Sequence, residues 1–423
     1  MASGPDLSPH DRDILNGSLG EGSRLAMRIV VELARAMGAE RLIDIESAHV
    51  DGCLYHGEVS LDFAERLSAA GARVAVPTTL NVGTVDLLHP DRFRGDPELA
   101  ERGRRLMEVY AGMGCRPTWT CAPYQVASAR PRFGHHVAWA ESNAIVFVNS
   151  VLGARTDRYG DFIDVCAAIT GRVPDTGLHR TENRRGRILF RLGGMPDRLL
   201  FHDLLYPTVG HVVGRRAGTR VPVIEGLPPD TSEDRLKAMG AAAASSGSVA
   251  LFHAVGVTPE AATVEEAFRG EDPDEVVEVG PHDLRRARDA LSTAADGRLD
   301  AVSVGTPHFS VSEIERLLQL LAGARPRIPF YVSTGRDVLR DVNDLGFAGD
   351  LEAAGVTVVT DTCTYLTPIL RPEVDVVMTN SAKWAYYAPA NIGVRVILGS
   401  LEECVRSSVE GTVWRDDELF RDR

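Results

Sequence analysis

The sequence has 423 residues, of which 44% are hydrophobic and 25% charged, and this length predicts two or three packed α/β units rather than one core. The 46 Lys and Arg residues against 59 Asp and Glu residues give a formal charge of −13, which argues against a nucleic acid partner because an acidic surface repels phosphate backbones. The sequence lacks a run of about 18 apolar residues and a basic, apolar leader, so we expect no membrane span and a cytoplasmic location.

The six cysteines are scattered and show neither the dense spacing of a disulfide framework nor the CxxC pairs of a structural zinc site. In a reducing compartment each one is a buried thiol, a metal ligand or a nucleophile. The six are Cys53, Cys115, Cys121, Cys166, Cys363 and Cys404.

In the first half of the chain, helix signals alternate with strand signals. A helix is predicted over 24–37, because Met27, Val30, Val31 and Ala34 share one face, and Asp96 with Pro97 is typical of a helix start. Apolar runs predict strands over 41–47, 72–78, 117–123, 144–150, 187–194 and 221–227.

The second half shows the same alternation more clearly. An alanine-rich helix is predicted over 238–248, and Ser310 with Glu313 forms the capping box of another helix. Strands are predicted over 249–256, 299–305, 328–333, 356–363, 374–381 and 394–400, with a helix over 337–346. Strands that alternate with helices indicate parallel α/β layers.

Polar side chains follow many of these predicted strands. Ligands of parallel α/β sheets bind beyond the carboxyl ends of the strands, so this position favours one polar site built from many loops. The candidate residues are Ser47, His49, Thr78, Thr79, Asn81, Cys121, Tyr124, Asn149, Arg155, Thr306, His308, Arg336, Cys363, Ser381 and Lys383.

Several segments of the sequence resemble the large subunit of the aconitase X family. The segments are ESAHVDG, VPTTLN, TCAPY, PRFGHHVAWAESNAIVFVNSVLGARTDR, GTPHFS, TDTCTYLTPIL and MTNSAKWAYYAPANIG. The resemblance covers the chain from about residue 15 to about residue 410.

This resemblance implies the catalytic architecture of the aconitase superfamily, with several three-layer parallel α/β units around a central cleft. We treat residues 1–423 as one catalytic large subunit, with soft internal boundaries near 215 and 270–300. The family's small swivelling domain is expected to be absent from the chain and carried by a separate small subunit, which is the expected partner and a source of a serine-type base.

The resemblance also implies an iron–sulfur cluster. Cys121 in TCAPY and Cys363 in DTCTY match the cysteines that ligate the cluster. Relatives carry a third cysteine where this sequence has Thr306, which cannot supply a thiolate. The nuclearity, two-iron or three/four-iron, therefore stays open, with Cys115 or His308 as a possible replacement ligand.

Further roles are assigned by chemistry on this basis. Lys383 is the candidate for binding the substrate carboxylate or phosphate, and Ser47 and His49 are candidates for contact with the leaving hydroxyl. Glu141 is a candidate for orienting His49 or transferring a proton. Candidate substrate contacts are Thr78, Thr79, Asn81, Tyr124, Asn149, Arg155, Arg336 and Ser381.

The function implied is that of a hydro-lyase that dehydrates a small anionic hydroxy acid. We prefer cis-3-hydroxy-L-proline, giving pyrroline-2-carboxylate in hydroxyproline breakdown, because Thr306 departs from the three-cysteine pattern. The alternative substrate is mevalonate 5-phosphate. An alternative of another class is a catalytically weakened homologue that acts as a scaffold or binding subunit.

Overall fold

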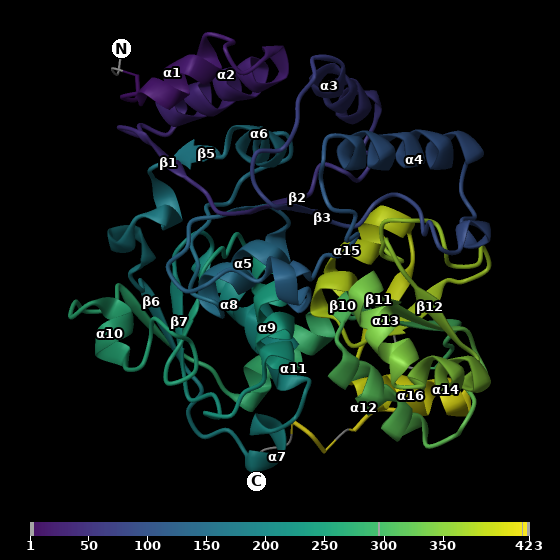
Figure 1. Ribbon diagram of the computed structural model, residues 1–423. Helices are drawn as coiled ribbons and strands as arrows, with labels where there is room; N and C mark the ends of the chain where they lie inside the picture. Colours follow the sequence, from purple (N-terminus) through teal and green to yellow (C-terminus); the bar gives the residue numbers. More distant parts are fainter. Residues whose placement is uncertain (1–3, 295–296, 417, 421–423) are drawn as a thin grey trace. The chain divides into compact units, whose positions relative to one another are not determined.

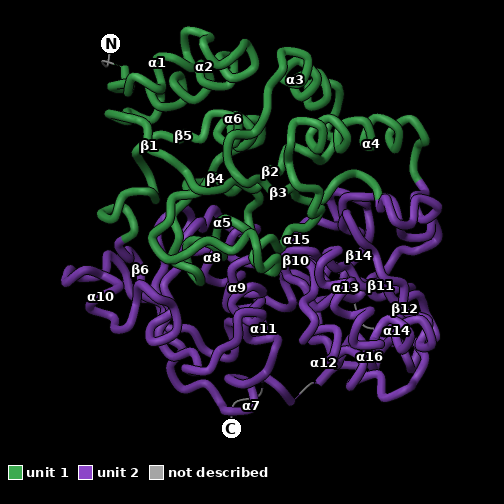
Figure 2. The backbone as a smooth tube through the Cα atoms, in the orientation of Figure 1, with its two compact units in different colours: residues 1–85, 95–184 green, residues 86–94, 185–423 purple. Residues whose placement is uncertain are grey.

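The computed structural model describes residues 4–294, 297–416 and 418–420. The chain divides into two compact units, residues 1–85 with 95–184 and residues 86–94 with 185–423 (Figure 2). The expected boundary near 215 falls inside a helix of the second unit, α8 (Leu205–Ala217). No helix among the described residues is long and apolar enough to cross a membrane.

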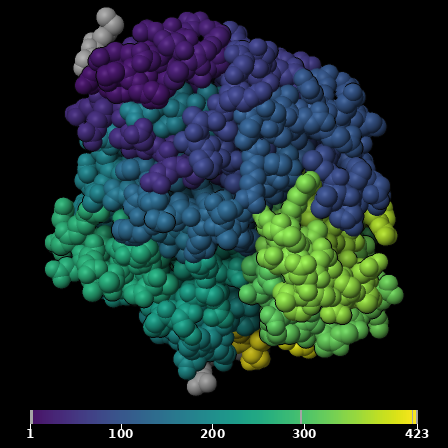
Figure 3. All heavy atoms as spheres, viewed as in Figure 1, coloured from purple at the N-terminus to yellow at the C-terminus, as the bar shows by residue number. Residues whose placement is uncertain are grey.

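Unit 1 contains a small parallel sheet in the order β3-β2-β4 and an antiparallel pair, β1-β5. The long helix α2 packs against α6, and α1 and α2 lie at the surface of this unit (purple in Figure 3). The elements are α1 (Pro9–Leu15), α2 (Glu21–Ala36), β1 (Leu42–Asp44), β2 (Ala48–Val50), α3 (Glu58–Ala69), β3 (Thr78–Leu80), α4 (Pro97–Gly112), η2 (Pro123–Gln125), η3 (Ala127–Ala129), β4 (Ala138–Trp139), α5 (Ser142–Ser150), α6 (Ile163–Thr170), β5 (Arg172–Pro174), η4 (Gly177–His179) and η5 (Thr181–Arg184).

Unit 2 contains two all-parallel sheets, in the orders β8-β7-β6-β9 and β12-β11-β10-β13-β14 (Figure 1). Its elements are η1 (Pro90–Arg92), β6 (Ile188–Arg191), α7 (Asp197–Leu200), α8, β7 (Pro222–Glu225), α9 (Glu233–Ser246), β8 (His253–Ala254), α10 (Val264–Phe268), β9 (Glu275–Glu278), α11 (Pro281–Ala290), β10 (Ala301–Phe309), α12 (Val311–Leu321), β11 (Phe330–Thr334), α13 (Arg336–Asp344), α14 (Phe347–Ala354), β12 (Val356–Val359), β13 (Val376–Thr379), α15 (Ala382–Ile392), β14 (Arg395–Leu398) and α16 (Leu401–Glu410).

The five-stranded sheet has a continuous apolar core. Ile314 and Leu317 of α12 and Val405 of α16 pack with Val302 and Val332 of the central strands. Ser310 accepts from the amide of Glu313, whose side chain accepts from the amide of Ser310, so the predicted capping box is confirmed. Asp96 likewise caps α4 as predicted, with Pro97 in its first turn.

Helices α8 and α9 approach each other closely because both present small residues. A Cβ added at Gly210 would overlap the carbonyl oxygen of Met239, and one added at Gly214 would overlap Ser246 and the carbonyl of Ala243. The alanine-rich segment predicted as a helix is therefore a packing surface, and it forms the second half of α9.

Several strand predictions in the first half are wrong. Residues 144–150 lie in α5, a buried helix, and residues 117–123 form an irregular loop that ends in η2. The strand predicted over 41–47 is confirmed in part, because β1 covers Leu42–Asp44, but the parallel sheet uses β2, which begins at Ala48. The strand predicted over 72–78 is misplaced, because β3 begins at Thr78. Residues 356–363 are extended only as far as Val359.

Candidate functional site

The carboxyl ends of the three parallel strands in unit 1 carry a group of polar residues. Asp51 follows β2, Asn81 follows β3, and Glu141 follows β4 by two positions. Asn81 donates a hydrogen bond from Nδ2 to Oδ1 of Asp51. The corrected strand register thus places Asp51 at the carboxyl end of β2, the end at which parallel α/β sheets bind ligands.

His49 lies within β2 and is fully buried. Its Nδ1 is 2.8 Å from Oγ1 of Thr79, its ring lies 5.8 Å from the Trp139 ring between centroids, and its Nε2 has no hydrogen-bond partner among the described residues. Burial lowers the pKa of His49 to about 3, against the opposing charge of Glu141. The imidazole is therefore neutral near pH 7, with Nε2 available as a donor or acceptor according to the tautomer.

The half-buried Asp51 and the fully buried Asp164 are acidic neighbours in unit 1. Oδ2 of Asp164 accepts hydrogen bonds from the amides of Asp51, at 2.7 Å, and Gly52, at 3.3 Å, which fixes the loop after β2. Burial and then the charges of Asp161 and Glu141 raise the pKa of Asp51 well above its usual value. Burial and Asp161 raise the pKa of Asp164 to about 7. A raised carboxyl pKa in a polar site is typical of a group that can hold a proton for transfer.

Glu141 is held in a strained backbone conformation, with φ at 71° in the left-handed region. Its carboxylate caps α5 by accepting from the amide of Ala144 at 2.8 Å, and it accepts from Nδ2 of Asn143 at 2.9 Å. A left-handed glutamate persists only where its surroundings hold it, and such residues concentrate at functional sites.

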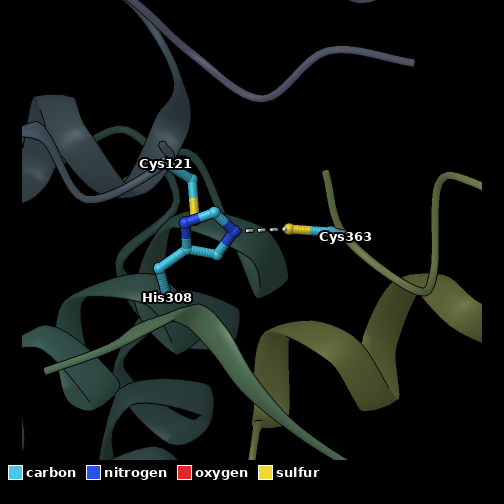
Figure 4. A group of neighbouring side chains, drawn as sticks. All are labelled: Cys121, His308 and Cys363. Atoms are coloured by element: carbon cyan, nitrogen blue, oxygen red, sulfur yellow. Dashed lines mark hydrogen bonds between the residues drawn. The ribbon is translucent and has the colours of Figure 1, made fainter. Parts of the chain in front are cut away.

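Unit 2 brings Cys363 and His308 together (Figure 4). Sγ of Cys363 is 3.8 Å from Nε2 of His308, and both side chains are almost fully buried. Nε2 of His308 also lies 3.2 Å from the carbonyl oxygen of Thr362. A thiolate and an imidazole are ligands suited to iron, so this pair fits a metal or an iron–sulfur group.

Thr306 lies two residues before His308 on β10. Its Oγ1 is buried and makes no hydrogen bond among the described residues, while its carbonyl oxygen accepts from the hydroxyl of Ser381. Ser381 caps α15, whose second residue is Lys383, 4% exposed. Ser381 thus has a structural partner, and it links the start of α15, which carries the buried Lys383, to Thr306 of β10.

Cys121 belongs to unit 1 and lies in the loop that precedes η2. The thiol is buried, and the backbone carbonyl of Cys121 accepts from Nδ2 of Asn143. Because Asn143 is also bonded to Glu141, the capped start of α5 holds the Cys121 loop in place.

Four predicted substrate contacts have structural partners. Tyr124 donates a hydrogen bond to Asn143 at 2.8 Å, and Asn149 forms hydrogen bonds with Thr156 and Arg184 within 3.1 Å. Arg155 donates to the carbonyl oxygen of His179 at 2.9 Å. Arg336 forms an ion pair with Asp361 through two hydrogen bonds of 2.6 Å. Ser47, Thr78 and Thr79 line a cavity of unit 1 at the amino-terminal ends of β2 and β3. Their substrate roles stay predictions.

Asp51 and Lys237 were not predicted from the sequence. The ESAHVDG segment contained the signal for Asp51, but the misplaced strand directed attention to Ser47. Lys237 of α9 is 2% exposed and donates to Asp234 at 2.9 Å, to Glu313 and to the carbonyl oxygen of His308 at 3.3 Å. Asp234 is a neighbour in sequence, but no local pattern signals the other two partners, which lie more than seventy residues away.

Comparisons with known proteins agree with this organisation. Family models described as the first, second and third domains of aconitase X match residues 4–182, 187–289 and 299–410. A cis-3-hydroxy-L-proline dehydratase of Pseudomonas aeruginosa is 43% identical over 417 residues, which are 97% of this chain and 71% of that protein.

Two archaeal proteins match over nearly their full length. The phosphomevalonate dehydratase large subunit of Methanothermobacter thermautotrophicus is 37% identical, with 95% of this chain and 98% of that protein covered. The crystal structure of Thermococcus kodakaraensis aconitase X in its holo form matches with a TM-score of 0.85 and 34% identity, covering 95% of this chain and all of that one. The chain belongs to the aconitase X family.

Proposed function

We propose that this chain is the catalytic part of a dehydratase that removes water from cis-3-hydroxy-L-proline and yields pyrroline-2-carboxylate. The relatives from Pseudomonas aeruginosa and Methanothermobacter thermautotrophicus are both named dehydratases. Membership of the same family therefore supports hydro-lyase activity for this chain. The observation that carries the substrate choice is the identity of 43% to the hydroxyproline enzyme, against 37% to the phosphomevalonate enzyme. Mevalonate 5-phosphate is the second candidate substrate.

We propose that Cys363 and His308 of unit 2 hold an iron or iron–sulfur group together with Cys121 of unit 1. These three residues each offer one thiolate or imidazole ligand atom. His308 takes the role that a third cysteine has in the family pattern, since Thr306 has no thiolate. When bound, the group supplies Lewis acidity toward the departing hydroxyl.

The remaining chemistry is assigned to the chain's own side chains. Lys383 is the proposed cation for the substrate carboxylate. Asp51, whose pKa burial raises, is the proposed proton donor to the leaving hydroxyl, while neutral His49 and Asn81 position the substrate. Glu141 positions the start of α5, and with it the loop of Cys121. The carbon-bound proton is expected to leave to a base on the small swivelling domain.

A partner subunit is part of the proposal. The chain matches 98% of a relative that is named a large subunit, which supports a complex with a small chain that completes the site. The six cysteines, all within the described residues, form no disulfide, which supports a reducing, cytoplasmic location.

The metal assignment is tested with Cys363→Ser, and Cys404→Ser is the matched control because Cys404 is a buried thiol of α16 within the apolar core. Anaerobic purification should give a coloured wild type and control and a colourless, inactive Cys363→Ser variant with normal far-ultraviolet dichroism. Retention of iron and turnover by Cys363→Ser would reject the assignment. A colourless wild type after reconstitution with iron and sulfide would favour the scaffold alternative.

A further inference from the structure

A cavity of about 510 Å³ opens on unit 1 at the amino-terminal ends of β2 and β3. It lies at the opposite edge of the sheet from Asp51 and Asn81, which follow the carboxyl ends of the same strands. The volume is within the range of small-molecule sites.

The charge of this lining is opposite to that of the whole chain. Arg116, Arg130 and Arg132 line the cavity against a single carboxylate, Glu46, in a chain whose formal charge is −13. Glu46 is already engaged, because its Oε2 lies 3.0 Å from Nδ1 of His135. The cavity is therefore a local cationic site on an acidic protein, which focuses anions that the rest of the surface repels.

Two of these arginines, Arg116 and Arg130, make hydrogen bonds to neighbouring residues. The amide of Arg116 donates to the carbonyl of Thr78 at 2.7 Å, which ties the residue to β3, and its Nη1 bonds the hydroxyl of Ser128. Arg130 donates from Nη1 to the carbonyl of Tyr124 at 3.4 Å. Guanidinium forks bind phosphate and carboxylate oxygens in pairs, and Ser47 and Thr78 add hydroxyl-bearing residues to the wall.

We propose that this cavity binds a small polyvalent anion, such as a phosphorylated or polycarboxylic metabolite, at a site separate from the proposed dehydration site. The occupant would contact Arg116 and Arg130, which flank the segment that carries Cys121 on its two sides. It would also lie against Thr79, whose hydroxyl is bonded to His49. A bound anion would thus order both the Cys121 loop and the hydrogen-bonded pair of His49 and Thr79. This effect does not depend on which hydroxy acid is dehydrated.

The test uses pyrophosphate and citrate as probes, titrated calorimetrically into the full chain at low ionic strength. The variants are the Arg130→Gln/Arg132→Gln double variant, in which both side chains are exposed, and Arg73→Gln as the matched control, an exposed arginine of the same unit outside the cavity. We expect one saturable site that weakens at least about tenfold in the double variant and is unchanged in the control. Tighter binding of pyrophosphate indicates a phosphorylated ligand, and tighter binding of citrate a polycarboxylate.

Hydrogen exchange provides a second measurement. Saturating probe should slow amide exchange in residues 116–132 of the wild type and leave the double variant unchanged. No saturable binding of either probe below about 1 mM would overturn the proposal, since such an affinity is too weak for a built site. Equal weakening in Arg73→Gln would also overturn it, because it would mean that only the overall charge matters.

Discussion

The buried Lys237, which donates to the carbonyl oxygen of His308 on β10, gives the sharpest prediction about stability. Lys237 is 2% exposed and joins Asp234, Glu313 and the carbonyl of His308. Replacing it in Lys237→Met removes the cation and leaves two poorly solvated carboxylates. Breaking a buried ion pair on one side costs about 3–5 kcal/mol, so we expect a loss of that size in the free energy of unfolding at pH 8.

The pH dependence of this loss has a definite sign. Burial raises the pKa of Glu313 to about 7 even with the lysine in place, and removal of the cation raises it further. Below pH 6 the folded variant can protonate Glu313, so the difference from wild type should shrink. Adding Glu313→Gln to Lys237→Met should recover part of the loss while keeping an acceptor for the amide of Ser310.

Denaturant unfolding followed by circular dichroism at pH 8 and pH 5.5 measures both effects. Arg340→Met is the control, because Arg340 pairs with Asp337 on the exposed face of α13 and should show no measurable change. A loss below about 1 kcal/mol in Lys237→Met, independent of pH, would refute the view that Lys237 stabilises the end of β10 and the start of α12.

Three further predictions concern unit 1 and the helix pair of unit 2. The pKa of Asp164 in the folded protein is raised to about 7. The stabilisation from its bound proton is therefore fully present below pH 4, and the free energy of unfolding falls by about 4 kcal/mol as the pH rises to 7. Asp164→Asn should flatten this pH dependence, and an unchanged slope would contradict the raised pKa of Asp164. Asp11 is fully buried and pairs with Arg172 at 2.8 Å, so Asp11→Asn should cost about 3 kcal/mol in denaturant unfolding, whereas a cost near zero would show that the pair is solvated. Gly214→Ala would push a methyl group into α9 and should lower stability by about 1–3 kcal/mol; an unchanged melting temperature would mean that α8 and α9 can separate without cost.

The last third of the chain was well predicted from the sequence because its local signals agree with one another. The capping box of Ser310 and Glu313 fixes the start of α12, and the strands of the five-stranded sheet are apolar runs bounded by polar residues. The buried residues Ile314, Leu317 and Leu321 of α12 lie on one apolar face, so period and cap point to the same helix there.

The α5 segment was misread because it is buried on nearly all sides. Ile145, Val146 and Val148 are β-branched and adjacent, which is typical of a buried strand. A short helix with no exposed face has no amphipathic period, so the sequence alone could not distinguish the two. The decisive contact is the cap that Glu141 provides to Ala144.

The candidate site was predicted in part. Cys363, His308 and Lys383 were found from motifs, and the structure places the first two side by side. Asp51 was missed because the strand register was wrong by several residues, and a shift of that size changes which residues lie at the carboxyl end of a strand. The roles of Arg336 and Asn149 were predicted without knowledge of their partners, since Asp361 and Arg184 are distant in sequence.

One measurement tests the central proposal most directly. The chain, co-expressed with its small-subunit candidate and purified without oxygen, is assayed with cis-3-hydroxy-L-proline and with mevalonate 5-phosphate under the same conditions. We expect turnover of the proline derivative to pyrroline-2-carboxylate, with activity lost in Cys363→Ser. Dehydration of mevalonate 5-phosphate alone would contradict the substrate assignment, and a complex that is inactive on both despite bound iron would contradict the proposed function.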